Sequence, residues 1–138
     1  MVPARGVEKR LADPAIPEAI QRFLADHVAS AEELDALMLL HAQRDRAWTA
    51  EALSQALFSV PQSAALTLER LQAKGLAAAA DGSPHAWRYA ATGADDGCIA
   101  ELAKVYRANR AAVIKHLFER RADPVRSLAD AFRLRKDR

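Results

Sequence analysis

The sequence predicts a mainly α-helical fold with one small β-hairpin, and three observations support this. Hydrophobic residues make up 51% of the 138 positions, which is enough to bury the core of one domain. Apolar side chains recur at helical spacing in successive stretches that begin at capping residues. The turn signal DGSPH stands between an alanine run and the aromatic segment AWRYA, which is typical of a hairpin.

Two helices are predicted in the first third of the chain. The first is DPAIPEAIQRFLADHV, in which Asp13 can cap the helix and Pro14 suits its first turn. The second is SAEELDALMLLHAQ, where Ser30 and Glu33 have the spacing of a capping box. The side chains predicted to face inward are Ile16, Ile20, Phe23, Leu24, Val28, Leu34, Leu37, Met38 and His41.

Two further helices and the hairpin follow a short connection, RDRAW. Thr49 can cap AEALSQALF, and Trp48 before it suits a hydrophobic staple. Pro61 or the residues just after it start the next helix, which Gly75 ends because glycine adopts the left-handed conformation at little cost. The segment 76–80, LAAAA, has a helical composition but stands where the first strand of a hairpin is needed, so both assignments stay open.

The last third of the chain reads as linker and helix. TGADDG is the linker, and Asp95 or Asp96 can cap a long helix from about Cys98 to Arg121. A second helix restarts in ADPVRSLADAFRLRKDR, with Asp123 as its cap. The apolar stripe of the long helix consists of Ile99, Leu102, Val105, Tyr106, Val113 and Leu117.

The stretch TAEALSQALFSVPQSAALTLERLQAKGLAAAADGSPHAWRYA resembles the winged helix-turn-helix domain of bacterial regulators of the MarR and ArsR type. The most specific part is LERLQAKGL, which is similar to the ending L-x-x-L-x-x-x-G-L of the family's recognition helix. The resemblance implies a winged helix over residues 30–91. It is flanked by an N-terminal helical extension, residues 1–29, and by C-terminal helices, residues 92–138.

The resemblance also implies where DNA binds, because the third helix of this fold enters the major groove and the wing reaches a minor groove. The outer face of that helix would comprise Gln62, Ser63, Ala65, Leu66, Glu69 and Arg70, with Thr67 and Lys74 at its edges. In the wing, Arg88 would contact DNA. We therefore expect a small DNA-binding transcriptional regulator whose contacts are Gln62, Ser63, Leu66, Thr67, Arg70, Lys74 and Arg88.

The charge pattern favours an alternative function. Residues 30–92 carry five basic and seven acidic side chains, net −2, whereas residues 93–138 carry eleven basic and seven acidic ones, net +4. Because phosphate neutralisation provides much of the affinity for DNA, the acidic segment favours a protein-interaction module that keeps the winged-helix shape. A partner would then bind the third helix around Leu66 or the basic C-terminus, where Phe132, Arg133, Arg135 and Lys136 form a candidate interaction site.

Other sites are open to two interpretations. The stripe of the long C-terminal helix can form a homodimer interface, as the resemblance implies, or pack on its own domain. Trp48 and Trp87 can line an effector pocket or belong to the core. Cys98 can be a redox-sensitive thiol near a helix N-terminus, although Asp95 and Asp96 oppose a lowered thiol pKa.

The sequence predicts neither catalysis nor a bound cofactor. It contains no glycine-rich phosphate loop, nucleophile elbow or His-Glu-x-x-His motif, and its four histidines are far apart, so we expect no metal site and no enzyme. No apolar run approaches the roughly 20 residues of a membrane-spanning helix. The single cysteine suits a reducing compartment, and a cytoplasmic location is expected.

Overall fold

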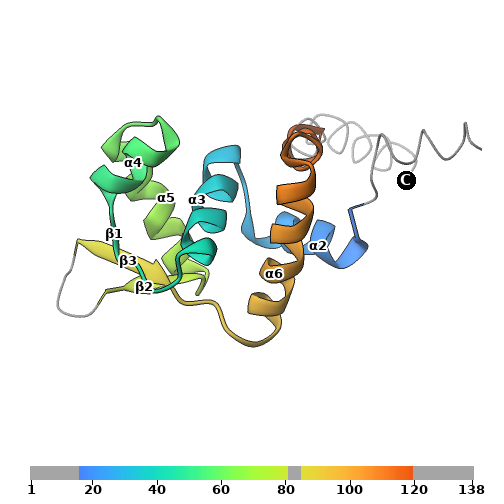
Figure 1. Cartoon of the computed structure of the whole chain (residues 1–138), viewed down its shortest axis with the longest axis horizontal. Helices are drawn as coiled ribbons and strands as arrows, with labels where there is room; N and C mark the ends of the chain where they lie inside the picture. The colour runs from blue at the N-terminus through green and yellow to red at the C-terminus, as the bar shows by residue number, and fades with distance from the viewer. Residues whose placement is uncertain (1–15, 81–84, 120–138) are drawn as a thin grey trace, which may run out of the picture.

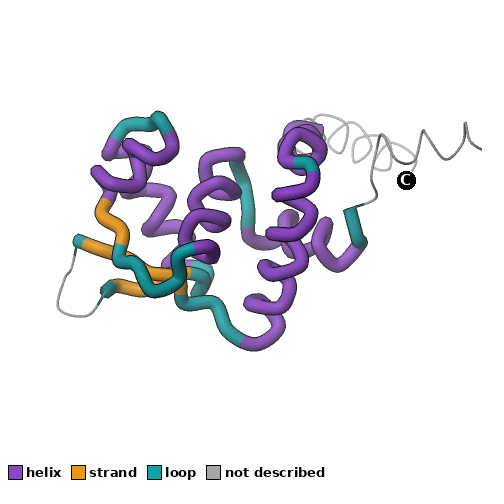
Figure 2. Tube along the Cα trace, viewed as in Figure 1, coloured by secondary structure: helices purple, strands orange, loops and turns teal. Residues whose placement is uncertain are grey.

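The computed structural model of the chain describes residues 16–80 and 85–119 and confirms a largely helical fold with a small antiparallel sheet. Helix α3 is central, because it contacts α4, α5, α6 and strand β3 (Figure 1). The strands lie together at one end of the molecule, away from α2 and α6 (Figure 2). The elements are α2 (Glu18–His27), α3 (Ala31–Ala42), β1 (Trp48–Thr49), α4 (Ala50–Leu57), α5 (Pro61–Ala73), β2 (Ala77–Ala79), β3 (Ala86–Tyr89) and α6 (Gly93–Ala108).

The start of α3 follows the predicted capping box with one difference. The Ser30 hydroxyl accepts a hydrogen bond from the Glu33 N–H at 3.1 Å, as expected for this cap. The Glu33 carboxylate, however, accepts from the N–H of Ala29 at 3.0 Å, one residue before the cap. For α2, the predicted cap at Asp13 lies outside the described residues, and within them the helix begins after Pro17.

The segment 76–80, which the sequence left open, contains a strand. Strand β2 pairs antiparallel with β3, with Ala77 opposite Tyr89 and Ala79 opposite Trp87. A third strand, β1, pairs with the other edge of β3 and gives the sheet order β1-β3-β2. Trp48 belongs to β1 and lies opposite Trp87, so it is a buried strand residue rather than only a hydrophobic staple.

The connection between α4 and α5 is tight and contains an exposed aromatic residue. The predicted cap of α4 is confirmed, because the Thr49 hydroxyl accepts from the Ala52 N–H at 3.1 Å. Helix α4 ends at Phe58, which has a φ of 56° and is 97% exposed. Helix α5 then begins at Pro61, and its C-terminal turn places Gly75 at a φ of 79°, as predicted.

The apolar residues of α4 predict an inward face of Ala52, Leu53, Ala56 and Leu57, and the structure differs from this at Ala56. Leu53 is buried as expected, but Ala56 is exposed and Ser54 is buried in its place. The Ser54 hydroxyl donates to the Glu51 carbonyl oxygen at 2.8 Å, which satisfies the buried group within the helix. The buried face of α4 therefore includes a polar residue that the apolar pattern does not predict.

The single long helix predicted from Cys98 to Arg121 is wrong within the described residues. Helix α6 begins earlier, at Gly93, is interrupted at Asn109, and helix resumes over residues 110–119. Asn109 has φ −160° and ψ 78°, and its side chain accepts from the Ala112 N–H, so it caps the second segment. Cys98 thus lies in the second turn of α6, not at a helix N-terminus.

The apolar stripe of this region packs inside its own chain. Ile99, Leu102, Val113 and Leu117 are each at most 3% exposed and belong to the same core as α2 and α3. In the structure the stripe therefore folds back on its own domain and does not form a homodimer interface. These four side chains are not available to a partner subunit. Among the described residues, no helix is long and apolar enough to cross a membrane.

Candidate nucleic-acid interface

The outer face of α5 is exposed over its first three turns. Gln62 and Glu69 are exposed, and Leu66 is 51% exposed, as the sequence predicts for a face that contacts a partner. Ser63 is half-buried and donates its hydroxyl hydrogen to Glu32 at 2.7 Å. Thr67 is only 3% exposed, so its predicted position at the edge of the outer face is wrong.

Two of the predicted DNA-contacting cations share a buried carboxylate. Glu33 is fully buried, and its oxygens lie 3.3 Å from the Lys74 ammonium and 3.4 Å from the Arg70 guanidinium. The same ammonium donates to the His27 carbonyl oxygen at 2.6 Å. Because a buried carboxylate needs compensating donors, Lys74 ties the end of α5 to the α2–α3 junction.

Arg70 retains guanidinium N–H donors that can still contact a partner. Its side chain is 57% exposed, and the guanidinium carries five N–H donors, of which the ion pair with Glu33 uses a fraction. Lys74 is 27% exposed and has less freedom. Together with Glu33, the two cations leave one net positive charge at the C-terminal part of α5.

The wing is described only in part, because residues 81–84 lie outside the described residues. Arg88 in β3 is half-buried, and its Nε is buried without a hydrogen-bond partner among the described residues. Trp87 donates its indole N–H to Gln72 of α5 at 2.8 Å and so fixes the hairpin against that helix. The hairpin is therefore held beside α5.

Sequence reasoning missed a cation next to the sheet. Arg46 is exposed, and its guanidinium carbon lies 3.7 Å from the centroid of the Trp48 ring. A cation stacked on an aromatic ring is held in place while its N–H groups remain available at the ring edge. The signal in the sequence is the pair Arg44 and Arg46 just before Trp48, within the segment RDRAW that is predicted as a connection.

Apolar side chains are also exposed near the N-terminus of α5. Phe58, Val60 and Leu66 are 97%, 55% and 51% exposed. Phe58 adopts a left-handed conformation that costs a bulky residue roughly 1–2 kcal/mol. A strained and fully exposed aromatic residue contributes little to packing, so this group of three residues, the α4–α5 apolar patch, is a second candidate contact surface.

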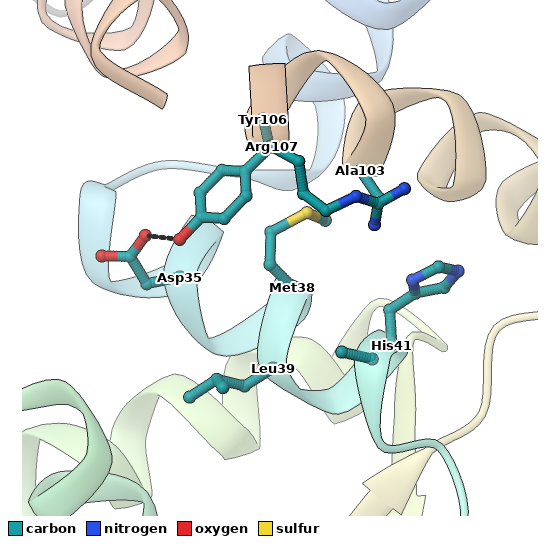
Figure 3. A pocket seen from close by; sticks show the side chains of 8 residues that line it. Asp35, Met38, Leu39, His41, Ala103, Tyr106 and Arg107 are labelled. Carbon is teal, nitrogen blue, oxygen red and sulfur yellow. Dashed lines mark hydrogen bonds between the residues drawn. The ribbon is translucent and has the colours of Figure 1, made fainter. Parts of the chain in front are cut away.

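A cavity of about 160 Å³ lies between α3 and α6 (Figure 3). Its walls are mostly apolar, and neither Trp48 nor Trp87 contributes to it, so the cavity lies elsewhere than the effector pocket considered from the sequence. Trp48 is 2% exposed and belongs to the core. The lining residues are Asp35, Met38, Leu39, His41, Ala42, Ala103, Tyr106 and Arg107.

One end of this cavity is closed by a polar cluster. Asp35 accepts from the Tyr106 hydroxyl at 2.6 Å and makes two hydrogen bonds with Arg110, at 2.7 and 3.1 Å. Burial, and then the hydrogen bond to Asp35, raises the pKa of Tyr106, and the hydrogen bond to Asp35 raises the pKa of Arg110. Tyr106 and Arg110 therefore stay protonated at neutral pH, and their bonds to Asp35 join α3 to both sides of the break at Asn109.

The other end of the cavity approaches a second cluster around Tyr89. The Tyr89 hydroxyl donates to Asp96 at 2.5 Å, which lowers the pKa of that carboxyl, and Arg44 pairs with Asp96 at 3.2 Å. His41 packs edge-on against the Tyr89 ring at 5.3 Å. Burial and then the nearby charge of Arg44 lower the pKa of His41, so its imidazole is neutral at pH 7.

The C-terminal interaction site predicted from the sequence, Phe132, Arg133, Arg135 and Lys136, lies outside the described residues. The candidate surfaces among the described residues are therefore those of α5, the sheet and the cavity. Comparison of the chain with protein-family models, with curated proteins and with solved structures gives no match. The functional argument consequently depends on the geometry of these three surfaces.

Proposed function

We propose that residues 30–91 form a winged helix-turn-helix that binds double-stranded DNA, and that the protein is a small transcriptional regulator. The order α3, β1, α4, α5, β2, β3 and the sheet order β1-β3-β2 support this proposal. In this fold the second helix of the helix-turn-helix enters the major groove. Helix α5 takes that position here, with the β2–β3 hairpin as the wing.

The observation that carries the proposal is the exposed outer face of α5 beside the hairpin. Gln62 and Arg70 are exposed on this face and have the side-chain chemistry to contact base edges or phosphates. Arg88 in β3 and Arg46 before β1 supply positive charge at the sheet. No carboxylate from the described residues forms an ion pair with either of these two arginines.

The number of available cations sets the expected salt dependence. Arg46, Arg70 and Arg88 could each neutralise one phosphate, so the logarithm of the affinity would fall with the logarithm of salt concentration with a slope of about −3 per protomer. A homodimer, which the resemblance implies, would double that slope. It would need an interface other than the buried stripe of Ile99 and Leu102.

Fluorescence anisotropy of the full chain with mixed-sequence duplex DNA, over a salt series, tests the proposal. The variants Arg70→Ala and Arg88→Ala should each weaken binding and reduce the salt slope by about one per protomer. Lys104→Ala is the matched control. Lys104 is exposed on α6, so this substitution also removes one positive charge, but far from α5. Equal binding by all three variants would refute the assignment of this face.

A second candidate function, a protein-interaction module, is favoured by the α4–α5 apolar patch. Phe58, Val60 and Leu66 are exposed apolar side chains at or near the start of α5, and the ion pairs with Glu33 reduce the positive charge that Arg70 and Lys74 offer to DNA. The double variant Phe58→Ser with Leu66→Ser separates the two functions. If the patch binds protein, this variant loses the partner while Arg70→Ala retains it. If α5 binds DNA, Arg70→Ala has the larger effect on DNA affinity.

A further inference from the structure

Two residues of the α4–α5 apolar patch are poorly suited to the folding of their own chain. Phe58 is 97% exposed and has a φ of 56°, a conformation that glycine adopts at the lowest cost. Val60 is 55% exposed and is the N-cap of α5, where its apolar side chain accepts no hydrogen bond. Glycine at the first position and serine at the second would each favour folding. Apolar side chains at both positions therefore indicate contact with a partner.

The charges near this patch are negative. Residues 47–69, which include β1, α4 and most of α5, contain no lysine, arginine or histidine. Glu69 is exposed on α5, and Glu32 reaches the turn between α4 and α5, where it accepts from the Ser59 hydroxyl at 3.1 Å. Neither carboxylate forms an ion pair within the described part of the chain, and the neighbouring cation Arg70 is already paired with a buried carboxylate. A partner that is both apolar and basic would complement this patch.

The chain itself contains a segment with this chemistry. Residues 125–138 lie outside the described residues, and the sequence gives them five basic and two acidic side chains, net +3. The apolar side chains of this segment are Val125, Leu128, Phe132 and Leu134, and the first three have the spacing of one helix face. The segment thus combines apolar side chains with the positive charge that residues 47–69 lack.

We propose that residues 125–138 of one copy bind the α4–α5 apolar patch of a second copy. Phe132 would cover Phe58 and Val60, while the basic side chains of the segment would face the carboxylates beside the patch. Figure 1 shows α4 and the last described helical segment, residues 110–119, on opposite sides of α3. The chain after residue 119 therefore starts away from its own patch, which favours the patch of another copy.

The two contacting surfaces differ, so the association is heterologous. A pair of copies would leave one patch and one C-terminal segment free, and further copies could add to them. This inference rests on the protein-interaction function proposed above, since it names the partner of the same patch. It does not depend on DNA binding by α5.

Sedimentation velocity of the full chain, over a concentration series at low and at high salt, tests the proposal. The patch variant is Phe58→Gly with Val60→Ser, in which both substitutions favour folding, so that lost association cannot be attributed to unfolding. The segment variant is Phe132→Ser with Arg135→Glu. Phe118→Ser is the matched control, because Phe118 is 62% exposed and belongs to neither surface.

We expect the wild type to self-associate, and to do so more weakly at high salt because the charges involved are exposed. The patch variant and the segment variant should each weaken association by about 10-fold or more, as truncation of a central apolar contact does, whereas Phe118→Ser should behave as the wild type. An equimolar mixture of the two variants should form a 1:1 complex, since one retains an intact segment and the other an intact patch.

Three results would overturn the proposal: a wild type that stays monomeric at every concentration, a patch or segment variant that associates as the wild type does, and a mixture of the two variants that stays monomeric. The last result would place the contact within one copy or elsewhere on the surface. The DNA-binding experiment with Arg70→Ala changes neither Phe58 nor Phe132, so failure of this inference and failure of the DNA-binding proposal are observed separately.

Discussion

Replacing Glu33 with glutamine should lower the stability of the fold by more than the loss of an ordinary hydrogen bond. Glu33 is fully buried and accepts from the Ala29 N–H, the Lys74 ammonium and the Arg70 guanidinium. A glutamine oxygen in the position of Oε1 can replace the acceptor for both the Ala29 N–H and the Lys74 ammonium, but it carries no negative charge. Its amide group then takes the position of Oε2 and places N–H donors against the Arg70 guanidinium, where the carboxylate previously accepted.

The magnitude follows from the exposure of the two cations. Lys74 is 27% exposed, so its hydrogen bond to the buried charge contributes in the range of about 1.5–3 kcal/mol. Arg70 is 57% exposed, so its longer contact contributes about 0–1 kcal/mol. Glutamine no longer buries a charge, which offsets part of this loss. Because the glutamine oxygen still accepts from Lys74, only part of the first contribution is lost, and we expect a net decrease of about 1–2 kcal/mol in the free energy of unfolding, or roughly 5 °C in Tm.

Urea unfolding followed by far-UV circular dichroism measures this difference, and Glu32→Gln is the matched control. Glu32 is the preceding residue in the same first turn of α3, is half-buried, and accepts from the hydroxyls of Ser59 and Ser63. An amide oxygen can accept from hydroxyls as well, so this control should lose about 1 kcal/mol or less. Equal effects of the two substitutions would refute the structural role assigned to Glu33.

Further predictions concern backbone conformation and pH. Gly75→Ala should destabilise by about 1–2 kcal/mol because of its positive φ, whereas Gly97→Ala, inside α6 with open space around it, should stabilise by about 0.5–1 kcal/mol; thermal unfolding distinguishes them. Phe58→Gly should raise the unfolding free energy or leave it unchanged, since the side chain is exposed and its φ is positive; a clear loss in urea unfolding would contradict this. Burial, and then the charge of Arg44, lowers the pKa of His41 below its ordinary value of 6.5. The unfolded chain therefore binds a proton more readily, and stability should fall as the pH drops below about 6.5; His41→Gln should weaken this dependence in unfolding measured between pH 7.5 and 5.5.

The local signals of helix ends were predictable from sequence. Ser30, Thr49, Pro61 and Gly75 each act at the position that their side chain or backbone chemistry predicts. These effects involve residues no more than about four positions apart, so the sequence contains all the information they require. The second strand of the hairpin was likewise predictable from the turn signal and the aromatic residues, whereas the sequence leaves the first strand, in residues 76–80, open to a helical assignment as well.

The missed features depend on residues distant in sequence. Strand β1 has only two residues, and it is a strand because β3, nearly 40 positions later, pairs with it. The break at Asn109 was hidden because the apolar spacing continues from α6 into residues 110–119 with little change. The partners of Glu33 lie 37 and 41 positions away, so the sequence could assign it to a cap but not to an ion pair.

These distant pairs change what the net charge of a segment means for DNA binding. Two of the seven acidic side chains in residues 30–92, Glu33 and Asp35, face inward or away from α5. The net charge of −2 for this segment therefore overstates the negative charge near bound DNA. Glu33 is buried behind Arg70 and Lys74, and Asp35 pairs with Arg110 on the side of α3 that faces α6. The charge that a phosphate would meet is determined mainly by exposed groups such as Glu69, Arg70 and Arg46. A measured salt slope near −3 per protomer would therefore be consistent with an acidic domain, since that slope depends on local contacts and not on the total charge.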